Sequence, residues 1–249
     1  MKKKNRTIFR SLPALLFWAL VWQWAAMAMG NPLLLPTPGQ VLLRLWQLMG
    51  EAAFWQTTGI SIGRVLLGVA LGVTLGVVLA VCTSLSSLAE MLVAPAMTAI
   101  QATPVASFAI LVLIWLERDL VPVLICVLMV LPVVWNAVST GIRETDGQLL
   151  EMAKVCCLPK IRILKRIYIP SVMPYFRSAS TSALGLGWKA GIAAEVLTVP
   201  RSSIGRMIAE SKSYLLTEEL FAWTLTVIAL SLLLQKLMLR LMEGRRRGC

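Results

Sequence analysis

Residues 143–171 read RETDGQLLEMAKVCCLPKIRILKRIYIPS and form a polar stretch between long apolar segments. The first part, 146–157, predicts a short helix, because Asp146 is suited to its N-cap and apolar residues recur on one broad face. That face holds Leu149, Leu150, Ala153, Val155 and Cys156. Pro159 ends this helix, since proline lacks a backbone N–H, and a second helix is expected over 160–168. The stretch therefore predicts a helix, a turn and a helix.

The second helix of this stretch is expected to end before Pro170. The whole segment carries the cations Lys154, Lys160, Arg162, Lys165 and Arg166. A segment of this kind can lay an apolar helical face into a groove on another protein, with its charges fixing the register. Alternatively, it is a positively charged loop that only sets membrane topology.

The composition excludes a water-soluble domain with an ordinary polar surface. Hydrophobic residues make up 58% of the chain, charged residues 14%, and the mean hydropathy is +0.78. We therefore expect the bilayer to be the solvent of this protein. The chain has no histidine, the commonest general base and metal ligand, which argues against an ordinary hydrolase or metalloenzyme.

The net charge of +12 does not indicate nucleic acid, because of where the cations lie. They gather at 2–10, in 143–171 and at 240–247, each beside an apolar segment. This is the positive-inside pattern, so all three regions are expected in the cytoplasm, beside membrane lipid. The cysteines lack metal-ligand spacing and are expected to be free thiols. Cys82 and Cys126 are predicted core residues, and the cytosolic ones are Cys156, Cys157 and Cys249.

Six apolar segments are long enough to cross a membrane, which predicts an all-α membrane protein. They are residues 12–29, 58–82, 91–116, 121–140, 172–199 and 220–239. Residues 31–40 predict a loop, and 40–50 predict an amphipathic helix at the outer interface. Residues 83–87 predict a polar turn, and 117–119 a tight outer loop. Six crossings place both termini and the 143–171 loop on the cytoplasmic side.

Two of these spans carry small residues or prolines with structural meaning. Gly68, Gly72 and Gly76 recur every four residues, which predicts a helix face that another backbone approaches closely. Pro95 and Pro104 are expected to break the third span. Backbone groups freed by such breaks must be satisfied by protein or water, which favours a broken helix beside a path.

Charged residues inside the spans are functional candidates, because burying a charge in the membrane is costly. Arg64 is expected to snorkel to the interface or to pair internally. Lys189 and Glu195 lie well inside the fifth span, six residues apart, so they do not pair with each other within the helix. They either line a path or form interhelical salt bridges that hold the bundle together.

The 143–171 stretch resembles the cytoplasmic EAA loop of permease subunits in binding-protein-dependent ABC importers. The family pattern is Glu-Ala-Ala, three residues, Gly, nine residues, then Ile-x-Leu-Pro. The same spacing runs here through Glu151-Met152-Ala153, Cys157 and Ile167-Tyr168-Ile169-Pro170. Cys157 replaces the glycine, and if that position requires a positive φ, cysteine costs roughly 1 kcal/mol there.

The fifth span is similar to the branch of this family that handles nitrate, sulfonates, taurine and similar solutes. Residues 185–195, GLGWKAGIAAE, match its Gly-x-Gly/Ala-Trp helix ending in Ala-Glu. Residues 102–107, ATPVAS, and Ser61, Arg64 and Gly68 fit the same branch. The resemblance covers nearly the whole chain beyond the first span.

The resemblance implies a permease subunit in a bacterial inner membrane, with two copies of an ABC ATPase subunit, a second permease subunit and an external solute-binding protein as partners. A homodimer is the simplest arrangement. The chain has no Gly-x-x-x-x-Gly-Lys-Ser/Thr loop, so ATP is expected on the partner ATPase, with no cofactor and no enzymatic activity in this chain.

The expected division is a first helix and outer segment (1–57), a five-span permease core with the EAA-like loop (58–241) and a basic tail (242–249). The residues expected to transmit force from the ATPase are Glu151, Ala153, Cys157, Leu158, Ile167 and Pro170. Those expected to line the path are Trp188, Lys189 and Glu195, with Lys189 offsetting the charge of an anionic solute.

Two other classes stay open at this point. In a secondary transporter driven by an ion gradient, Lys189 and Glu195 would form an ion relay. The EAA-like spacing and the lack of a clear inverted repeat argue against it. A non-transporting membrane scaffold would bind partners without moving solute. The identity of the solute is not encoded in any of these patterns.

Overall fold

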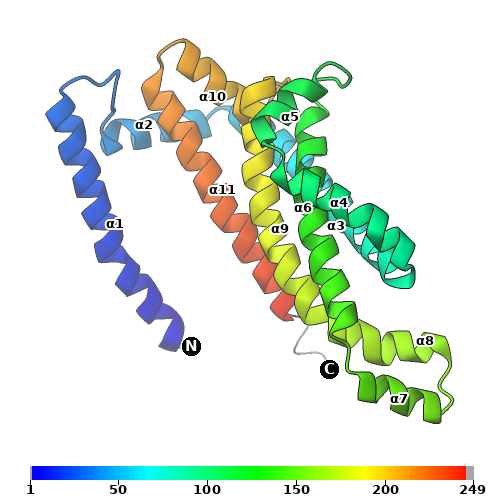
Figure 1. Cartoon of the computed structure of the whole chain (residues 1–249). Coiled ribbons are helices and arrows are strands. Elements are labelled where there is room, and N and C mark those ends of the chain that lie inside the picture. Colours follow the sequence, from blue (N-terminus) through cyan, green and yellow to red (C-terminus); the bar gives the residue numbers. More distant parts are fainter. Residues whose placement is uncertain (1, 245–249) are drawn as a thin grey trace.

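The computed structural model describes the backbone of residues 2–244 and the side chains of residues 13, 14 and 16–240. Every regular element in that part is helical, which confirms the all-α class (Figure 1). The elements are α1 (Lys2–Met29), α2 (Pro38–Met49), α3 (Ala52–Leu85), α4 (Ser87–Ala102), α5 (Val105–Val112), α6 (Val121–Arg143), α7 (Gly147–Val155), α8 (Lys160–Ile163), the π-helical turn η1 (Leu164–Tyr168), α9 (Ile169–Thr198), α10 (Ile204–Ser213) and α11 (Thr217–Gly244). Residues 245–249 of the predicted basic tail, with Cys249, lie outside the described residues.

Glycines bring α3 and α6 into close contact, as the four-residue repeat predicts. A methyl group on Gly72 would lie 2.8 Å from the Cβ of Val130, and one on Gly76 would lie 2.9 Å from the Leu131 carbonyl oxygen. Gly68 meets the Cβ of Cys126 in the same way, at 2.5 Å. Larger residues would separate the two helices, so this repeat fixes the central helix pair.

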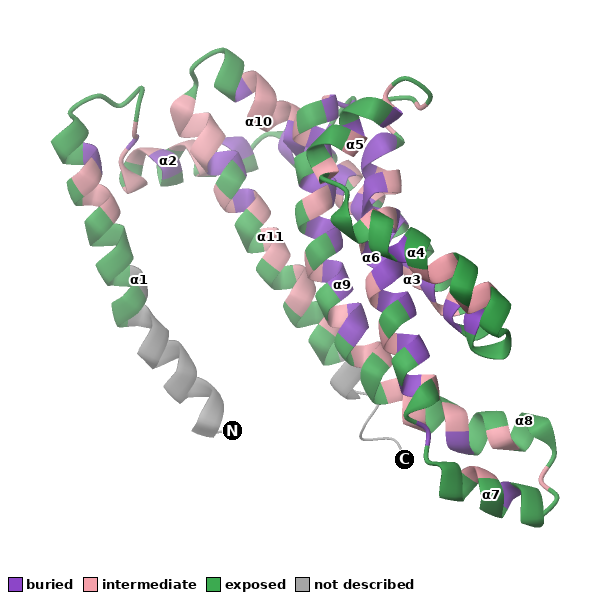
Figure 2. Cartoon of the chain, in the orientation of Figure 1, coloured by how far each residue is buried: buried purple, intermediate pink, exposed green. Residues whose placement is uncertain are grey.

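The third helix of the core, α9, packs against the same pair through its own glycines. A methyl group on Gly187 would lie 2.6 Å from Val69 on α3, and one on Gly191 would lie 2.6 Å from the Sγ of Cys126 on α6. Figure 2 shows buried residues where α3, α6 and α9 meet, and exposed residues along α1, α4 and the outer side of α11. Cys126 is buried as predicted, whereas Cys82 is exposed, so its assignment to the core was wrong.

The predicted third span is two helices rather than one. Helices α4 and α5 meet at an angle of 101°. Thr103 is extended, with ψ of 125°, because the proline that follows it disfavours the α region. The break at Pro104 is therefore confirmed, but Pro95 lies inside α4 without ending it. The predicted turn over 83–87 is also shorter, since only Ser86 separates α3 from α4.

The basic helix of the loop does not end before Pro170, contrary to the prediction. Helix α8, η1 and α9 follow one another without interruption. In a regular α-helix the ring of Pro170 would clash with the carbonyl of Arg166. Arg166 lies in the π-helical turn, whose wider backbone accommodates the proline. The loop is thus joined to the core by one continuous helical rod.

Three described helices are long and apolar enough to cross a membrane, namely α3, α6 and residues 217–240 of α11. The bent pair α4–α5 makes a fourth if it is one span. The polar and charged residues of α9, such as Arg177 and Lys189, lower its hydropathy. Three or four of the six predicted crossings are thus supported, and crossings by α1 and α9 stay predictions.

The helical loop projects from one end of the bundle. Figure 1 shows α7 and α8 at the end where α1 begins and α11 finishes, with α2 and α10 at the opposite end. Helix α1 stands apart from the core and contacts it near its C-terminal part. Trp22 there donates a hydrogen bond to the Pro36 carbonyl (3.1 Å), and its ring lies 5.6 Å from that of Phe221.

Candidate functional site

The projecting loop begins with the predicted cap. The carboxylate of Asp146 accepts a hydrogen bond from the backbone N–H of Gln148 at 2.9 Å, and α7 starts at the next residue, Gly147. An acidic side chain here also stabilises the positive end of the helix dipole. Helix α7 then runs for nine residues, Gly147–Val155.

The turn after α7 places Cys157 in a glycine-like conformation. Its φ is +47°, in the left-handed region. The N–H of Cys157 donates to the Lys154 carbonyl, and that of Leu158 donates to the Ala153 carbonyl, both at 3.0 Å. These two bonds define a Schellman motif, in which the left-handed residue is usually glycine. Strain at Cys157 is expected from the sequence only if this position requires a positive φ, and the structure shows that positive φ.

Helix α7 has one inward and one outward face. Ala153 is completely buried, and Ile167 of η1 is also buried, so these two residues mark the inner side of the loop. The outward face carries Glu151, Met152 and Val155, whose exposed fractions reach 53% for Met152 and 84% for Val155. Apolar side chains exposed at the polar end of a membrane bundle are unusual unless another surface covers them.

The other members of the predicted coupling set surround the turn and the rod. Leu158 is half-buried, whereas Cys157 and Pro170 are exposed. The described structure therefore brings Ala153, Cys157 and Leu158 together in one turn, while Pro170 lies at the base of the rod.

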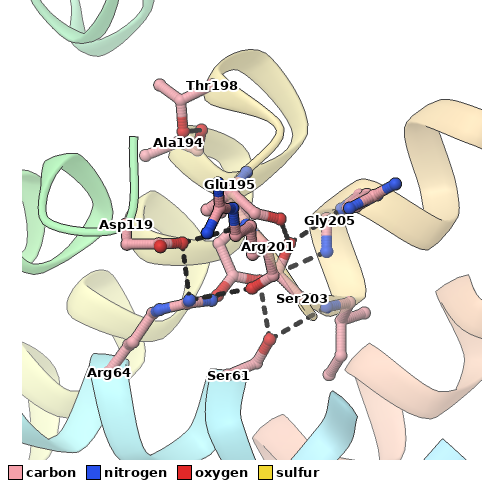
Figure 3. Close-up of polar contacts among 12 residues, drawn as sticks. Ser61, Arg64, Asp119, Ala194, Glu195, Thr198, Arg201, Ser203 and Gly205 are labelled. Atoms are coloured by element: carbon pink, nitrogen blue, oxygen red, sulfur yellow. Dashed lines mark hydrogen bonds and ion pairs between the residues drawn. The ribbon is translucent and has the colours of Figure 1, made fainter. Parts of the chain in front are cut away.

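A second cluster lies at the opposite end of the bundle, around Glu195. The carboxylate of Glu195 is completely buried. Its Oε2 accepts hydrogen bonds from the Ser61 hydroxyl at 2.8 Å and from the Gly205 N–H at 3.2 Å (Figure 3). Its Oε1 lies 3.7 Å from Nη1 of Arg64. A buried carboxylate is tolerated when it has such partners.

Arg64 extends this cluster to the outer loops. Its Nη2 donates to Oδ1 of Asp119 and to the carbonyl of Arg201, each at 2.8 Å (Figure 3). The same Asp119 oxygen accepts the Arg201 N–H at 2.9 Å. The cluster thus joins α3, α9, the loop before α6 and the segment between α9 and α10. Of the two predictions for Arg64, internal pairing is the one observed.

The segment between α9 and α10 is both strained and tightly packed. Val199 and Ser202 have φ of +48° and +46°, which is unfavourable for residues with a Cβ. A methyl group on Gly205 would lie 2.3 Å from the Cβ of Glu195 and 2.4 Å from its carbonyl carbon. The first turn of α10 can therefore lie directly on Glu195 only because residue 205 is glycine.

The three residues predicted to line a path occupy different surroundings. Trp188 is buried, and its indole N–H donates to the Val227 carbonyl of α11 at 3.2 Å. Glu195 lies in the cluster described above, while Lys189 is exposed on another side of α9. Contact between these residues and a transported solute stays a prediction, and the geometry of Glu195 fits the interhelical salt-bridge alternative.

Sequence reasoning missed part of the outer cluster. Asp119 and Gly205 were not singled out, because they lie in or beside loops that have no hydrophobic period. One signal was available on α3, where Ser61 and Arg64 are three residues apart and therefore share a helix face. That spacing shows a polar face, but it does not identify the partners that come from distant parts of the chain.

The sequence matches a known family over most of its length. The family described as "Binding-protein-dependent transport system inner membrane component" matches residues 72–246. The riboflavin transport system permease protein RibX of Chloroflexus aurantiacus is 32% identical over 240 residues, covering 92% of this chain and 89% of the relative. The taurine transport system permease protein TauC of Escherichia coli (strain K12) is 26% identical over 232 residues, covering 90% and 83%.

A third relative and one solved structure agree with these matches. The putative aliphatic sulfonates transport permease protein SsuC of Escherichia coli (strain K12) is 31% identical over 202 residues, covering 80% of this chain and 76% of the relative. A crystal structure of an amino acid ABC transporter with histidines superimposes with a TM-score of 0.60. It covers 76% of this chain and 90% of that chain at 15% identity, which supports the fold alone.

Proposed function

Since this chain belongs to the family of binding-protein-dependent transport system inner membrane components, we propose that it forms the path for a small solute and is driven by a separate ATPase. The chain is the transmembrane permease subunit of an ABC importer, not an enzyme. ATP binds to the partner in this proposal, and the permease needs no cofactor of its own.

The outward face of α7 carries the proposal that the loop docks on the ATPase. Val155 and Met152 expose apolar surface there, and Glu151 lies within the same turn. Such a face suits a groove on another protein, with the charges of the loop setting its register. Movement of the ATPase would then reach the core through the continuous rod of α8, η1 and α9. In this proposal Glu151, Ala153, Cys157, Leu158, Ile167 and Pro170 transmit force.

The proposed complex contains two permease chains, two ATPase chains and an external solute-binding protein. A homodimer would place the path at or near its two-fold axis. The proposed division is residues 1–57 for the first helix and outer segment together with the start of α3, 58–241 for the rest of the permease core and 242–249 for a cytoplasmic tail. The start of α1, the end of α11 and α7–α8 share one end of the bundle (Figure 1). Because the sequence is rich in cations in these regions, we propose that this end and both termini lie in the cytoplasm.

The solute is proposed to be a small molecule such as a sulfonate, taurine or nitrate. The names of the relatives include taurine, aliphatic sulfonates and nitrate. Lys189 is exposed on α9 and would offset the charge of an anion in transit. Trp188 and Glu195 are buried on the same helix and would hold it in position inside the bundle.

Uptake into proteoliposomes tests this proposal against a gradient-driven transporter. The permease, ATPase and binding protein are reconstituted with ATP inside, and radiolabelled taurine, an alkanesulfonate and nitrate are offered as solutes. We expect uptake to persist when an ionophore collapses the ion gradients, and to stop when ATP is omitted or the binding protein is left out. Uptake that follows the gradient and ignores ATP would instead support a secondary transporter.

A further inference from the structure

An apolar groove lies at the end of the bundle from which the loop projects. It has a volume of about 440 Å³ and is bordered by α3, α6, η1 and α9. Its lining includes Val81 and Leu85 of α3, Val138 of α6, Leu164 and Tyr168 of η1 and Phe176 of α9. The groove forms because α3 and α4 diverge from α6 and α9 toward this end of the bundle (Figure 1). The groove is therefore open toward the surroundings of the bundle.

The wall of the groove is continuous along the helical rod. Leu164, Tyr168, Val172 and Phe176 recur every four residues and form one apolar stripe. On the opposite wall Leu85 is 83% exposed, so the apolar surface is not covered within this chain. A long, narrow apolar partner would fit between the two walls.

The loop end of the groove is positively charged. Arg162, Lys165 and Arg166 belong to the same rod and are exposed, and none of them forms an ion pair with a described residue. Lys165 and Arg166 directly follow Leu164, which lines the groove, so these cations flank its loop end. Tyr168 lines the groove, and its hydroxyl has no hydrogen-bond partner among the described residues. These groups form a polar rim above an apolar groove.

We propose that the groove binds an acyl chain of an anionic phospholipid from the cytoplasmic leaflet, with its phosphate between Lys165, Arg162 and the Tyr168 hydroxyl. The cytoplasmic placement rests on the proposed function. Basic groups beside an apolar cleft at this depth attract anionic headgroups. A second copy of this chain is a poorer occupant, because each chain carries a net charge of +12 and would leave the rim uncompensated. The bound lipid joins the α3–α4 hairpin to the base of the loop.

Native mass spectrometry of the full chain tests this site. The protein is reconstituted with equal amounts of phosphatidylglycerol and phosphatidylcholine, extracted in a mild detergent, and the lipid retained per chain is counted. We expect the wild type to retain phosphatidylglycerol in preference to phosphatidylcholine. Val81→Trp, at a lining position that is 44% exposed, is expected to fill the groove and lose the retained lipid without disturbing the core.

Charge reversals separate headgroup recognition from acyl-chain binding. Lys165→Glu is expected to abolish the preference for phosphatidylglycerol, whereas Lys236→Glu, an equal change on exposed α11, is expected to keep it. Unchanged retention in Val81→Trp, equal retention of both lipids by the wild type, or equal effects of the two reversals would each overturn the proposal. So would cross-linking of Leu85→Cys to a second copy of the chain in the same vesicles.

Discussion

Replacing Cys157 with glycine should stabilise the loop. The residue has φ of +47°, a conformation that costs an ordinary L-residue about 1–2 kcal/mol. Glycine avoids this cost but loses about 0.5–1 kcal/mol more conformational entropy on folding than alanine would. The balance is about 1 kcal/mol in favour of Cys157→Gly, or roughly a fivefold shift in the local opening equilibrium.

Hydrogen exchange of the protein in nanodiscs measures this shift directly. The reporter is the Leu158 amide, which donates to the Ala153 carbonyl and opens when the turn opens. Cys156→Gly is the matched control, since Cys156 has φ of −78° and glycine gains nothing there. We expect protection of the reporter to rise in Cys157→Gly and to fall in the control. Equal or lower protection in Cys157→Gly would refute the argument from backbone strain.

Four further variants test the core and the path. Gly205→Ala should cost about 1–3 kcal/mol by overpacking against Glu195 and lower the unfolding temperature in detergent, and an unchanged temperature would contradict the close approach. Arg64→Met should cost about 3–5 kcal/mol, because it leaves Glu195 buried without its cation. Adding Glu195→Gln should recover much of that loss in the same assay, and no recovery would show that the two charges are not coupled. Lys189→Ala should lower solute uptake while complex assembly and basal ATP hydrolysis persist, whereas lost assembly would assign Lys189 to structure.

Local patterns predicted the features that depend on neighbouring residues. The cap at Asp146 followed from its side chain and its position before an apolar run. The glycine repeat at Gly68, Gly72 and Gly76 predicted a close helix contact, although not that α6 supplies the partner. The break at Pro104 followed from its effect on Thr103. Each of these outcomes is decided within one or two helical turns.

The errors arose where distant or collective effects decide the structure. Nothing in the local sequence shows that a π-helical turn accommodates Pro170, so the loop helix appeared to end there. Pro95 was expected to break its span but lies inside α4, because a proline inside a membrane helix does not always end it. The partners of Glu195 come from positions as distant as Ser61, and no periodic pattern records such a contact.

Co-purification of the ATPase subunit with the permease tests most directly whether α7 is the coupling surface. The comparison uses the wild type, Val155→Asp on the outward face of α7, and Tyr214→Asp at the opposite end of the bundle, where the side chain is 74% exposed. We expect one-to-one recovery of the ATPase with the wild type and Tyr214→Asp, and its loss with Val155→Asp. Equal recovery with both variants would contradict the claim that this loop holds the ATPase.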